Sequence, residues 1–404
     1  MTDYRLGVNT PLYPSVTFGF DDAERIAEVF AGGLPEGEYL YGRFGHPNYG
    51  DLCTRLAHME GGEKALVFAS GISATFTLFF ARLSVGDHIV VSSRIYGGTR
   101  GQLAMLAHKL RLKVSIVDVT DHADVLRACR KNTKIIYAES VSNPETVVTD
   151  VAMLALIRRK KSKGALLVID NTFTPFIMRP LALGADVVMH SLTKSVSGRS
   201  DVMGGALVGS SALMDALQHP LHGEASLVGA LLHPPVAQEM AERFCQIEDR
   251  VREGSERARL LGNLFQRAGL RAHYPVLASI RSIRPNAALS GLDGKEMGGA
   301  VLSVAFPTEA DGVRFVNAMK GTVIDDPLLG PMSLAIAAVS LGSSHTYVWC
   351  TTEARAQSKA TKWPSLPFSP VPFGFVRIAV GYAGDRTLVL DGFQKVLHGL
   401  GYTV

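Results

Sequence analysis

The stretch DVVMHSLTKSVSGRSDVMGG, residues 186–205, decides how the rest of the chain is interpreted. It opens with the apolar run Val187-Val188-Met189, which is short enough to form a buried strand. Polar residues then surround one lysine, Lys194, with Ser191 and Thr193 just before it. The amine of a partly desolvated lysine loses its proton readily and can attack a carbonyl, and nearby hydroxyls can hold a phosphate. The alternative is a surface loop with a solvated lysine.

A second stretch, ALLVIDNT at residues 165–172, ends a short apolar strand in Asp170. The carboxyl ends of strands are where open parallel sheets place ligand contacts. A carboxylate beside a pyridine nitrogen keeps that nitrogen protonated, so that the ring can draw electrons from a substrate carbanion. We therefore predict a pyridoxal 5'-phosphate site in which Asp170 contacts the pyridine nitrogen and Lys194 attacks the carbonyl. A cap or turn residue after a strand is the alternative for Asp170.

VIDNTF at residues 168–173, followed by the 186–205 stretch, resembles the Cys/Met-metabolism family of pyridoxal phosphate enzymes over nearly the whole chain. The resemblance implies an α/β protein of fold type I, like aspartate aminotransferase, with a mainly parallel sheet in the large domain. The expected organisation is an N-terminal arm over 1–45, a large cofactor-binding domain over 46–236 and a small α+β domain over 237–404. It further implies pyridoxal 5'-phosphate as the cofactor and a homotetramer, built as a dimer of dimers with shared active sites.

The composition is that of a globular protein with more than one domain, since 404 residues are too many for one ordinary core. The net charge of +4 is too weak to indicate a nucleic acid or membrane partner. The four cysteines have no metal-ligand spacing, and no metal is expected. We expect a cytoplasmic protein, because the N-terminus lacks a signal-like apolar core and no apolar run approaches the roughly 20 residues that cross a bilayer.

Strand and helix patterns alternate through the first half of the chain, which favours a parallel sheet with right-handed crossovers. No Gly-x-Gly-x-x-Gly motif follows a strand, and this disfavours a nicotinamide enzyme. The predicted strands are 65–68, 89–91, 114–117, 135–139, 165–170, 187–189 and 206–208, with helices at 22–30, 49–60, 123–129 and 151–163 and one opening after Ser70. Beyond residue 205 the pattern predicts a long helix over 237–267, strands at 300–306 and 376–380, and a helix at 311–319.

By resemblance, three segments hold the cofactor phosphate. Ser70-Gly71-Ile72 follow a strand and open a helix, where free N–H groups and the helix dipole both favour an anion. Ser191 and Thr193 are expected to contact the same phosphate. The family's Tyr-x-Arg reaches the cofactor phosphate of the adjacent chain, so Tyr41 and Arg43 are expected to do so here. A solvated surface arginine is the alternative for Arg43.

The resemblance also assigns the residues around the ring and the substrate. Tyr96 is expected to stack on the pyridine ring and assist proton transfer, and Asn143 to contact the ring hydroxyl. Arg377, in an apolar strand, is expected to bind the substrate's α-carboxylate in a bidentate ion pair, with Ser340 nearby. The alternatives are a tyrosine packed at the sheet edge, a turn asparagine before Pro144, and an edge-strand arginine in solvent.

The activity that the resemblance implies is γ-elimination on L-methionine or a related sulfur amino acid, by a carbon–sulfur lyase in which Lys194 binds the cofactor and moves protons. The Gly381-Tyr382-Ala383-Gly384 segment is similar to plant members that degrade methionine, whereas Gly98 stands where bacterial methionine-degrading members carry a cysteine. γ-Replacement, which joins an activated homoserine to cysteine, sulfide or a thiol, is the alternative within the family. A catalytically silent cofactor-binding protein and an aminotransferase are alternatives outside it.

Overall fold

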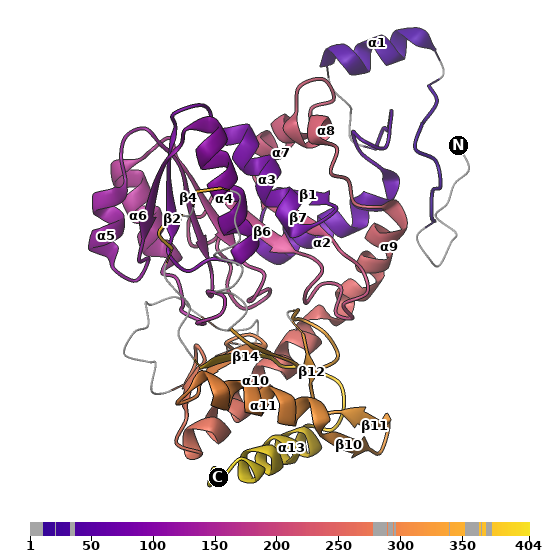
Figure 1. Cartoon of the computed structure of the whole chain (residues 1–404). Helices are drawn as coiled ribbons and strands as arrows, with labels where there is room; N and C mark the ends of the chain where they lie inside the picture. Colours follow the sequence, from indigo (N-terminus) through magenta and orange to yellow (C-terminus); the bar gives the residue numbers. More distant parts are fainter. Residues whose placement is uncertain are drawn as a thin grey trace.

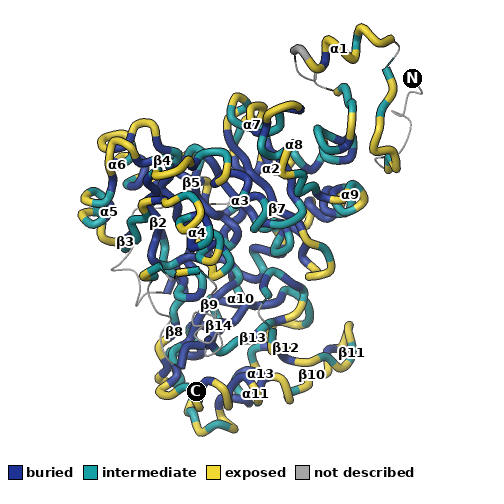
Figure 2. The backbone as a smooth tube through the Cα atoms, turned by 45° about the horizontal axis from the view of Figure 1, so that its top comes forward, coloured by how far each residue is buried: buried dark blue, intermediate teal, exposed yellow. Residues whose placement is uncertain are grey.

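The computed structural model describes residues 11–20, 22–32, 37–277, 289, 294, 296–338, 340–351, 363–364, 366–368 and 374–404. Two sheets organise these residues (Figure 1): one of seven strands with helices around it, and one of five strands closer to the C-terminus. An N-terminal segment carrying helix α1 (Ala23–Gly32) extends away from both sheets. Most strands of the two sheets are buried, while the N-terminal segment is largely exposed (Figure 2).

The seven-stranded sheet has the order β1-β7-β6-β5-β4-β2-β3. Strands β6, β5, β4, β2 and β3 run parallel, and β7 runs antiparallel to both of its neighbours. An antiparallel neighbour can follow through a loop without a crossover helix, and the loop after β6 connects to β7 in this way. The prediction of a mainly parallel sheet is therefore confirmed. The strands are β1 (Lys64–Phe68), β2 (His88–Ser92), β3 (Lys113–Val117), β4 (Thr133–Glu139), β5 (Leu166–Asp170), β6 (Val187–Ser191) and β7 (Gly205–Gly209).

Helices pack around this sheet, and short polar side chains begin several of them. Ser70, Asp121, Asp150 and Ser210 each accept a backbone N–H in the first turn of the helix that follows. Such caps satisfy N–H groups that have no partner inside the helix. The helices are α2 (Gly50–Glu60), α3 (Gly71–Arg82), α4 (Gly97–Leu110), α5 (His122–Ala128), α6 (Val151–Lys161), α7 (Ser211–Gln218) and α8 (Glu224–Val228), with a short 3-10 turn η2 (Pro47–Tyr49) before α2.

The long helix predicted over 237–267 is interrupted, so that prediction is wrong in its continuity. The structure has α9 (Pro234–Arg243), a 3-10 turn η3 (Phe244–Gln246) and α10 (Ile247–Arg267). The break lets α9 pack on α2 and lets α10 pack on strands β8 and β9 of the small sheet. Phe244, in the 3-10 turn, is buried and lies edge-on to Phe176. Packing of α9 on helix α2 and of α10 on strands of the small sheet therefore interrupts a helical sequence pattern that is continuous.

The five-stranded sheet has the order β12-β13-β14-β9-β8, so that β14 is its central strand. Phe265, Phe315 and Phe393 of three helices pack edge-on or tilted to one another beneath it. The strands are β8 (Arg271–His273), β9 (Val301–Ala305), β12 (Ile336–Ala337), β13 (Tyr347–Cys350) and β14 (Phe375–Ala379); the helices are α10, α11 (Glu309–Gly321) and α13 (Arg386–Gly399), and a hairpin joins β10 (Val323–Asp326) to β11 (Gly330–Ser333). The predicted small α+β region is present.

Gly205 starts β7 where that strand passes the beginning of α3, and this close approach can be tested. A Cβ at position 205 would lie 2.1 Å from the carbonyl oxygen of Ser70. We expect Gly205→Ala to lower the free energy of unfolding by about 1–3 kcal/mol, because the backbones must separate. Gly101→Ala in α4 is the control, since its added Cβ meets nothing within 4 Å. Urea unfolding in which both variants match the unaltered protein would contradict the close approach.

Candidate active site

The side chain of Lys194 lies half-buried at the junction of the two sheets. Its loop follows β6, and Nζ donates a hydrogen bond of 3.2 Å to Oγ of Ser340, which belongs to the segment before β13. Burial, together with the nearby guanidinium of Arg377, lowers the pKa of Lys194 from 10.5 to about 8. A lysine with this pKa has a substantial neutral fraction near neutral pH, and the neutral amine is the nucleophile.

Asp170 is buried at the carboxyl end of β5. Its Oδ1 accepts the backbone N–H of Thr172 at 3.0 Å and the Thr172 hydroxyl at 2.6 Å. Its Oδ2 accepts a longer bond of 3.5 Å from the hydroxyl of Tyr137. Burial raises the pKa of Asp170, and the bonds from Thr172 oppose that shift. A buried carboxylate with this acceptor capacity suits a cationic partner such as a protonated pyridine nitrogen.

The start of α3 forms a cradle next to the end of β6. Ser70 caps the helix, because its Oγ accepts the N–H of Ser73 at 3.1 Å within a capping box. The next two N–H groups, those of Gly71 and Ile72, are at the helix N-terminus, where an anion is favoured. A Cβ at position 71 would lie 3.0 Å from Cβ of Ser191, so glycine allows the two segments to touch. Four of the predicted phosphate contacts, Ser70, Gly71, Ile72 and Ser191, therefore share one small region.

Thr193 and Tyr96 lie near this cradle with partners of their own. Oγ1 of Thr193 accepts the N–H of Gly204 at 3.1 Å, which ties the two ends of the loop between β6 and β7. Tyr96 precedes α4, and its side chain is half exposed. A Cβ at Gly98 would lie 2.5 Å from the Tyr96 ring and 2.8 Å from Cδ1 of Ile72. The Tyr96 ring therefore occupies the space that a side chain at position 98 would need.

Arg377 joins the central strand of the small sheet to the large sheet. Nη1 donates to Oδ1 of Asn143 at 3.3 Å, and Nη2 donates to the carbonyl of Ser340 at 2.9 Å. The side chain is buried, and that burial lowers the pKa of Arg377 to about 10. Lys194, Ser340, Arg377 and Asn143 thus form one connected group at the junction of the two sheets.

Glu139 is a buried carboxylate that was not among the predicted site residues. Oε1 accepts the backbone N–H of Tyr96 at 2.5 Å, and Oε2 accepts that of Asn143 at 2.9 Å. Glu139 ends β4 directly opposite Asp170 on β5. Burial, followed by the charge of Asp170, raises the pKa of Glu139 to about 8. Its position at the end of a buried strand, as for Asp170, was the available signal.

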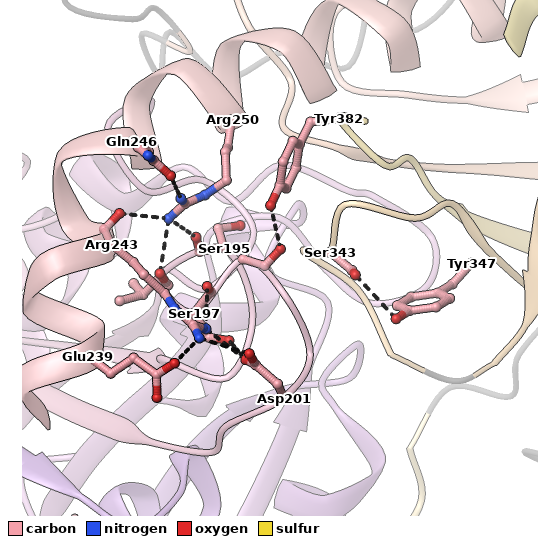
Figure 3. Close-up of polar contacts among 12 residues, drawn as sticks. Ser195, Ser197, Asp201, Glu239, Arg243, Gln246, Arg250, Ser343, Tyr347 and Tyr382 are labelled. Carbon is pink, nitrogen blue, oxygen red and sulfur yellow. Dashed lines mark hydrogen bonds and ion pairs between the residues drawn. The ribbon is translucent and has the colours of Figure 1, made fainter. Parts of the chain in front are cut away.

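Arginines of α9 and α10 hold the loop that follows β6 (Figure 3). Arg250 donates to the carbonyls of Ser195 at 3.2 Å and Val196 at 3.0 Å. Arg243 binds the carboxylate of Asp201 through both terminal nitrogens, at 2.7 and 2.8 Å. A carbonyl that accepts a charged donor is held more firmly than one that faces water, so these bonds anchor the loop to α9 and α10.

The small-sheet side holds the same loop. The hydroxyl of Tyr382, which follows β14, donates to the carbonyl of Gly198 at 2.8 Å (Figure 3). Gly342 has a φ of +72°, and a Cβ there would lie 2.5 Å from the carbonyl carbon of Lys194. Both contacts fix the backbone of Lys194 relative to the small sheet.

Tyr41 and Arg43 are not brought to the Lys194 group within one chain. Nη1 of Arg43 donates to the carbonyl of Ser226 in α8 at 3.1 Å, and its guanidinium lies 4.6 Å from the ring centre of Phe44. Tyr41 is 41% exposed. Their expected contact with the phosphate of a neighbouring chain stays a prediction.

Comparison with known proteins identifies the family. The model of the Cys/Met metabolism PLP-dependent enzymes matches residues 3–384, so the chain belongs to this family and pyridoxal phosphate is its cofactor. The chain is 32% identical to methionine gamma-lyase of Arabidopsis thaliana, covering 96% of this chain and 86% of that protein. It is 31% identical to L-methionine gamma-lyase of Porphyromonas gingivalis, covering 97% and 92%. The structure of cystathionine gamma synthase from Xanthomonas oryzae superposes with a TM-score of 0.80 at 26% identity, covering 99% and 95%.

The residues of this chain fit that cofactor in three respects. The buried carboxylate of Asp170 suits the pyridine nitrogen, the amine of Lys194 suits the aldehyde, and the start of α3 suits the phosphate. Within the described part of the chain, no three metal-ligating side chains gather into a cation site. The described helices include none that is both long and apolar enough to cross a bilayer.

The lowered pKa of Lys194 predicts a pH dependence for cofactor capture. About a tenth of an amine with a pKa near 8 is neutral at pH 7, and most of it is neutral at pH 9. We expect the rate at which cofactor-free protein binds pyridoxal phosphate covalently to rise with pH, with a midpoint near 8. Arg377→Met should move the midpoint upward, because a neighbouring positive charge is lost. A midpoint near 10.5, the ordinary value, would contradict the burial of the amine.

Replacement of Glu139 tests whether it holds the loops that carry Tyr96 and Asn143. Glutamine keeps one acceptor oxygen and turns an NH2 group toward the other backbone N–H. We expect Glu139→Gln to weaken pyridoxal phosphate binding about tenfold, since a buried N–H left without its acceptor costs about 1–3 kcal/mol. Fluorescence titration of the cofactor-free protein measures this. The control is Glu145→Gln, which alters an ion pair with Arg94 nearby; equal affinities for both variants would contradict the role.

Proposed function

We propose that the protein is a pyridoxal phosphate-dependent carbon–sulfur lyase that catalyses γ-elimination on L-methionine or a related sulfur amino acid. With methionine, the amino acid and one water give 2-oxobutyrate, ammonia and methanethiol. The observation that carries the proposal is the Lys194 amine, with a pKa near 8, within 3.2 Å of Ser340 and next to the buried Arg377. The identity of 31–32% with methionine gamma-lyases over nearly the full chain supports the choice of reaction.

The cofactor would be held from three sides by residues of this chain. Asp170 would keep a proton on the pyridine nitrogen, and Lys194 would bind the aldehyde carbon. Bound there, pyridoxal phosphate would supply an electron sink that stabilises negative charge on the substrate. Tyr96 and Asn143 would position the ring, and the phosphate would be bound by Ser70, Gly71, Ile72, Ser191 and Thr193.

Substrate positioning and proton transfer fall to other groups. Arg377 would bind the α-carboxylate through its guanidinium fork, which the bonds to Asn143 and Ser340 already orient. The Lys194 amine, once released by the incoming amino group, would take a proton from Cα and move protons at Cβ. Tyr96 would donate a proton to the departing sulfur. A half-exposed tyrosine suits this role, because the leaving thiol must reach solvent.

The assembly that we propose is a homotetramer, a dimer of dimers, in which Tyr41 and Arg43 complete the phosphate site of a neighbouring chain. The extended N-terminal segment that carries them supports this arrangement. We propose an arm over 1–45, a large domain over 46–236 and a small domain over 237–404, since strands β1–β7 lie within 64–209 and β8–β14 within 271–379. A cytoplasmic location is proposed as well, supported by four cysteines that form no disulfide.

γ-Replacement is the second candidate function. The similarity of fold to a cystathionine gamma synthase favours it, because that enzyme is a related member of the same fold. Both reactions would use the same lysine, arginine and buried carboxylate. After the leaving group departs, replacement adds a nucleophile at the γ-carbon, whereas elimination adds a proton there.

Release of 2-oxobutyrate from L-methionine alone tests the lyase proposal. We expect purified protein with added pyridoxal phosphate to release 2-oxobutyrate and methanethiol steadily, and Lys194→Ala to lose at least a thousandfold of this rate because both cofactor attachment and proton transfer are lost. Colorimetric assay of the keto acid and of the thiol measures it.

Two other outcomes would contradict the proposal in different ways. Consumption of an O-acylhomoserine only when cysteine or sulfide is present, with none of methionine, would make the protein a synthase. Turnover that persists in Lys194→Ala would show that Lys194 is not a residue of the active site.

A further inference from the structure

Four residues lie side by side across the small sheet, one on each of four neighbouring strands. Trp349 on β13 pairs with Arg377 on β14, which pairs with Ser303 on β9, which pairs with His273 on β8. Directly opposite residues of antiparallel strands point to the same face of a sheet. The side chains of Trp349 and Arg377 therefore share one face.

That face looks toward the large sheet. Oγ of Ser303 donates to the carbonyl of Pro144 at 2.6 Å, and Arg377 reaches Asn143 in the same loop. The residues that alternate with them face the helices instead, since a Cβ at Gly312 of α11 would lie 3.2 Å from Val376. Trp349 is the neighbour of Arg377 in this row. It therefore lies on the same face of the small sheet, the face on which our proposal places the substrate.

The indole of Trp349 carries a donor for which the described residues provide no acceptor. Its Nε1 is buried, and no hydrogen bond to it is found within the described part of the chain. An indole N–H can only donate, and a buried donor without an acceptor costs free energy. Cζ of Arg377 lies 5.2 Å from the centre of the Trp349 ring, a cation–π distance. An unpaired donor next to this arginine indicates a position for a ligand acceptor.

We propose that Trp349 is a substrate-binding residue, whose indole N–H donates to a carboxylate oxygen of the amino acid that Arg377 binds. The inference rests on the proposed function, because the amino-acid substrate brings the carboxylate to Arg377. A carboxylate offers about four acceptor positions, and a guanidinium fork uses two of them. The indole N–H supplies a third donor, and the ring supports the guanidinium from one side.

Trp349→Phe tests the donor while it keeps an aromatic ring beside Arg377. We expect KM for L-methionine to rise about tenfold with kcat changed less than twofold, the pattern of a contact made equally in ground and transition states. Inhibition by 3-(methylthio)propylamine, which lacks the carboxylate, should be unchanged. The matched control is Trp363→Phe, because Trp363 packs on His108 and Lys109 of α4. A KM within twofold of the unaltered enzyme would overturn the proposal.

A second measurement leaves Trp349 in place and does not depend on turnover. In Trp363→Phe holoenzyme, Trp349 is the one tryptophan, since the chain has two. Its fluorescence should change on addition of L-methionine and not on addition of the amine. A response to both ligands alike, or to neither, would overturn the carboxylate contact.

The two proposals fail separately. A carboxylate-dependent fluorescence change without release of 2-oxobutyrate would keep the role of Trp349 and reject the lyase activity. Release of 2-oxobutyrate with an unchanged KM in Trp349→Phe would keep the lyase activity and reject the role of Trp349.

Discussion

The amine of Lys194 is partly withdrawn from water at the junction of two sheets, and several contacts of the fold hold it there. A buried ammonium is costly, so the protonated form is disfavoured and the pKa falls to about 8. The backbone must hold the side chain in this position. Arg250 and Tyr382, which lie next to each other, together with the close approach of Gly342, fix the loop that carries Lys194.

The two sheets contribute different parts of the chemistry. In the large sheet, strands β4 and β5 end at the buried residues Glu139 and Asp170, which lie opposite one another. The small sheet places Arg377 on its central strand, with bonds to Asn143 and Ser340. Since the group around Lys194 needs both sheets, a change in their relative position would alter the surroundings of Lys194 and Arg377 together.

The sequence predicted the alternating strands and helices, the family and the residues that end apolar strands, because those signals are local. It could not predict that Glu139 joins the backbones of Tyr96 and Asn143, since that depends on how three loops meet. Pairing of Trp349 with Arg377 depends on strand register in the same way. The break between α9 and α10 arises because α9 packs on α2 while α10 packs on the small sheet, which a helical pattern does not encode. Whether Arg43 contacts a neighbouring chain can be seen only in the assembled oligomer.

Identification of the amine that holds the cofactor tests the central claim most directly. Borohydride treatment of the holoprotein fixes pyridoxal phosphate covalently to that amine, and mass spectrometry of a protease digest locates it. Our account predicts the modified residue to be Lys194 alone, since its amine has a lowered pKa and faces Ser340 and Arg377. Modification at another lysine, with Lys194 unmodified, would contradict it.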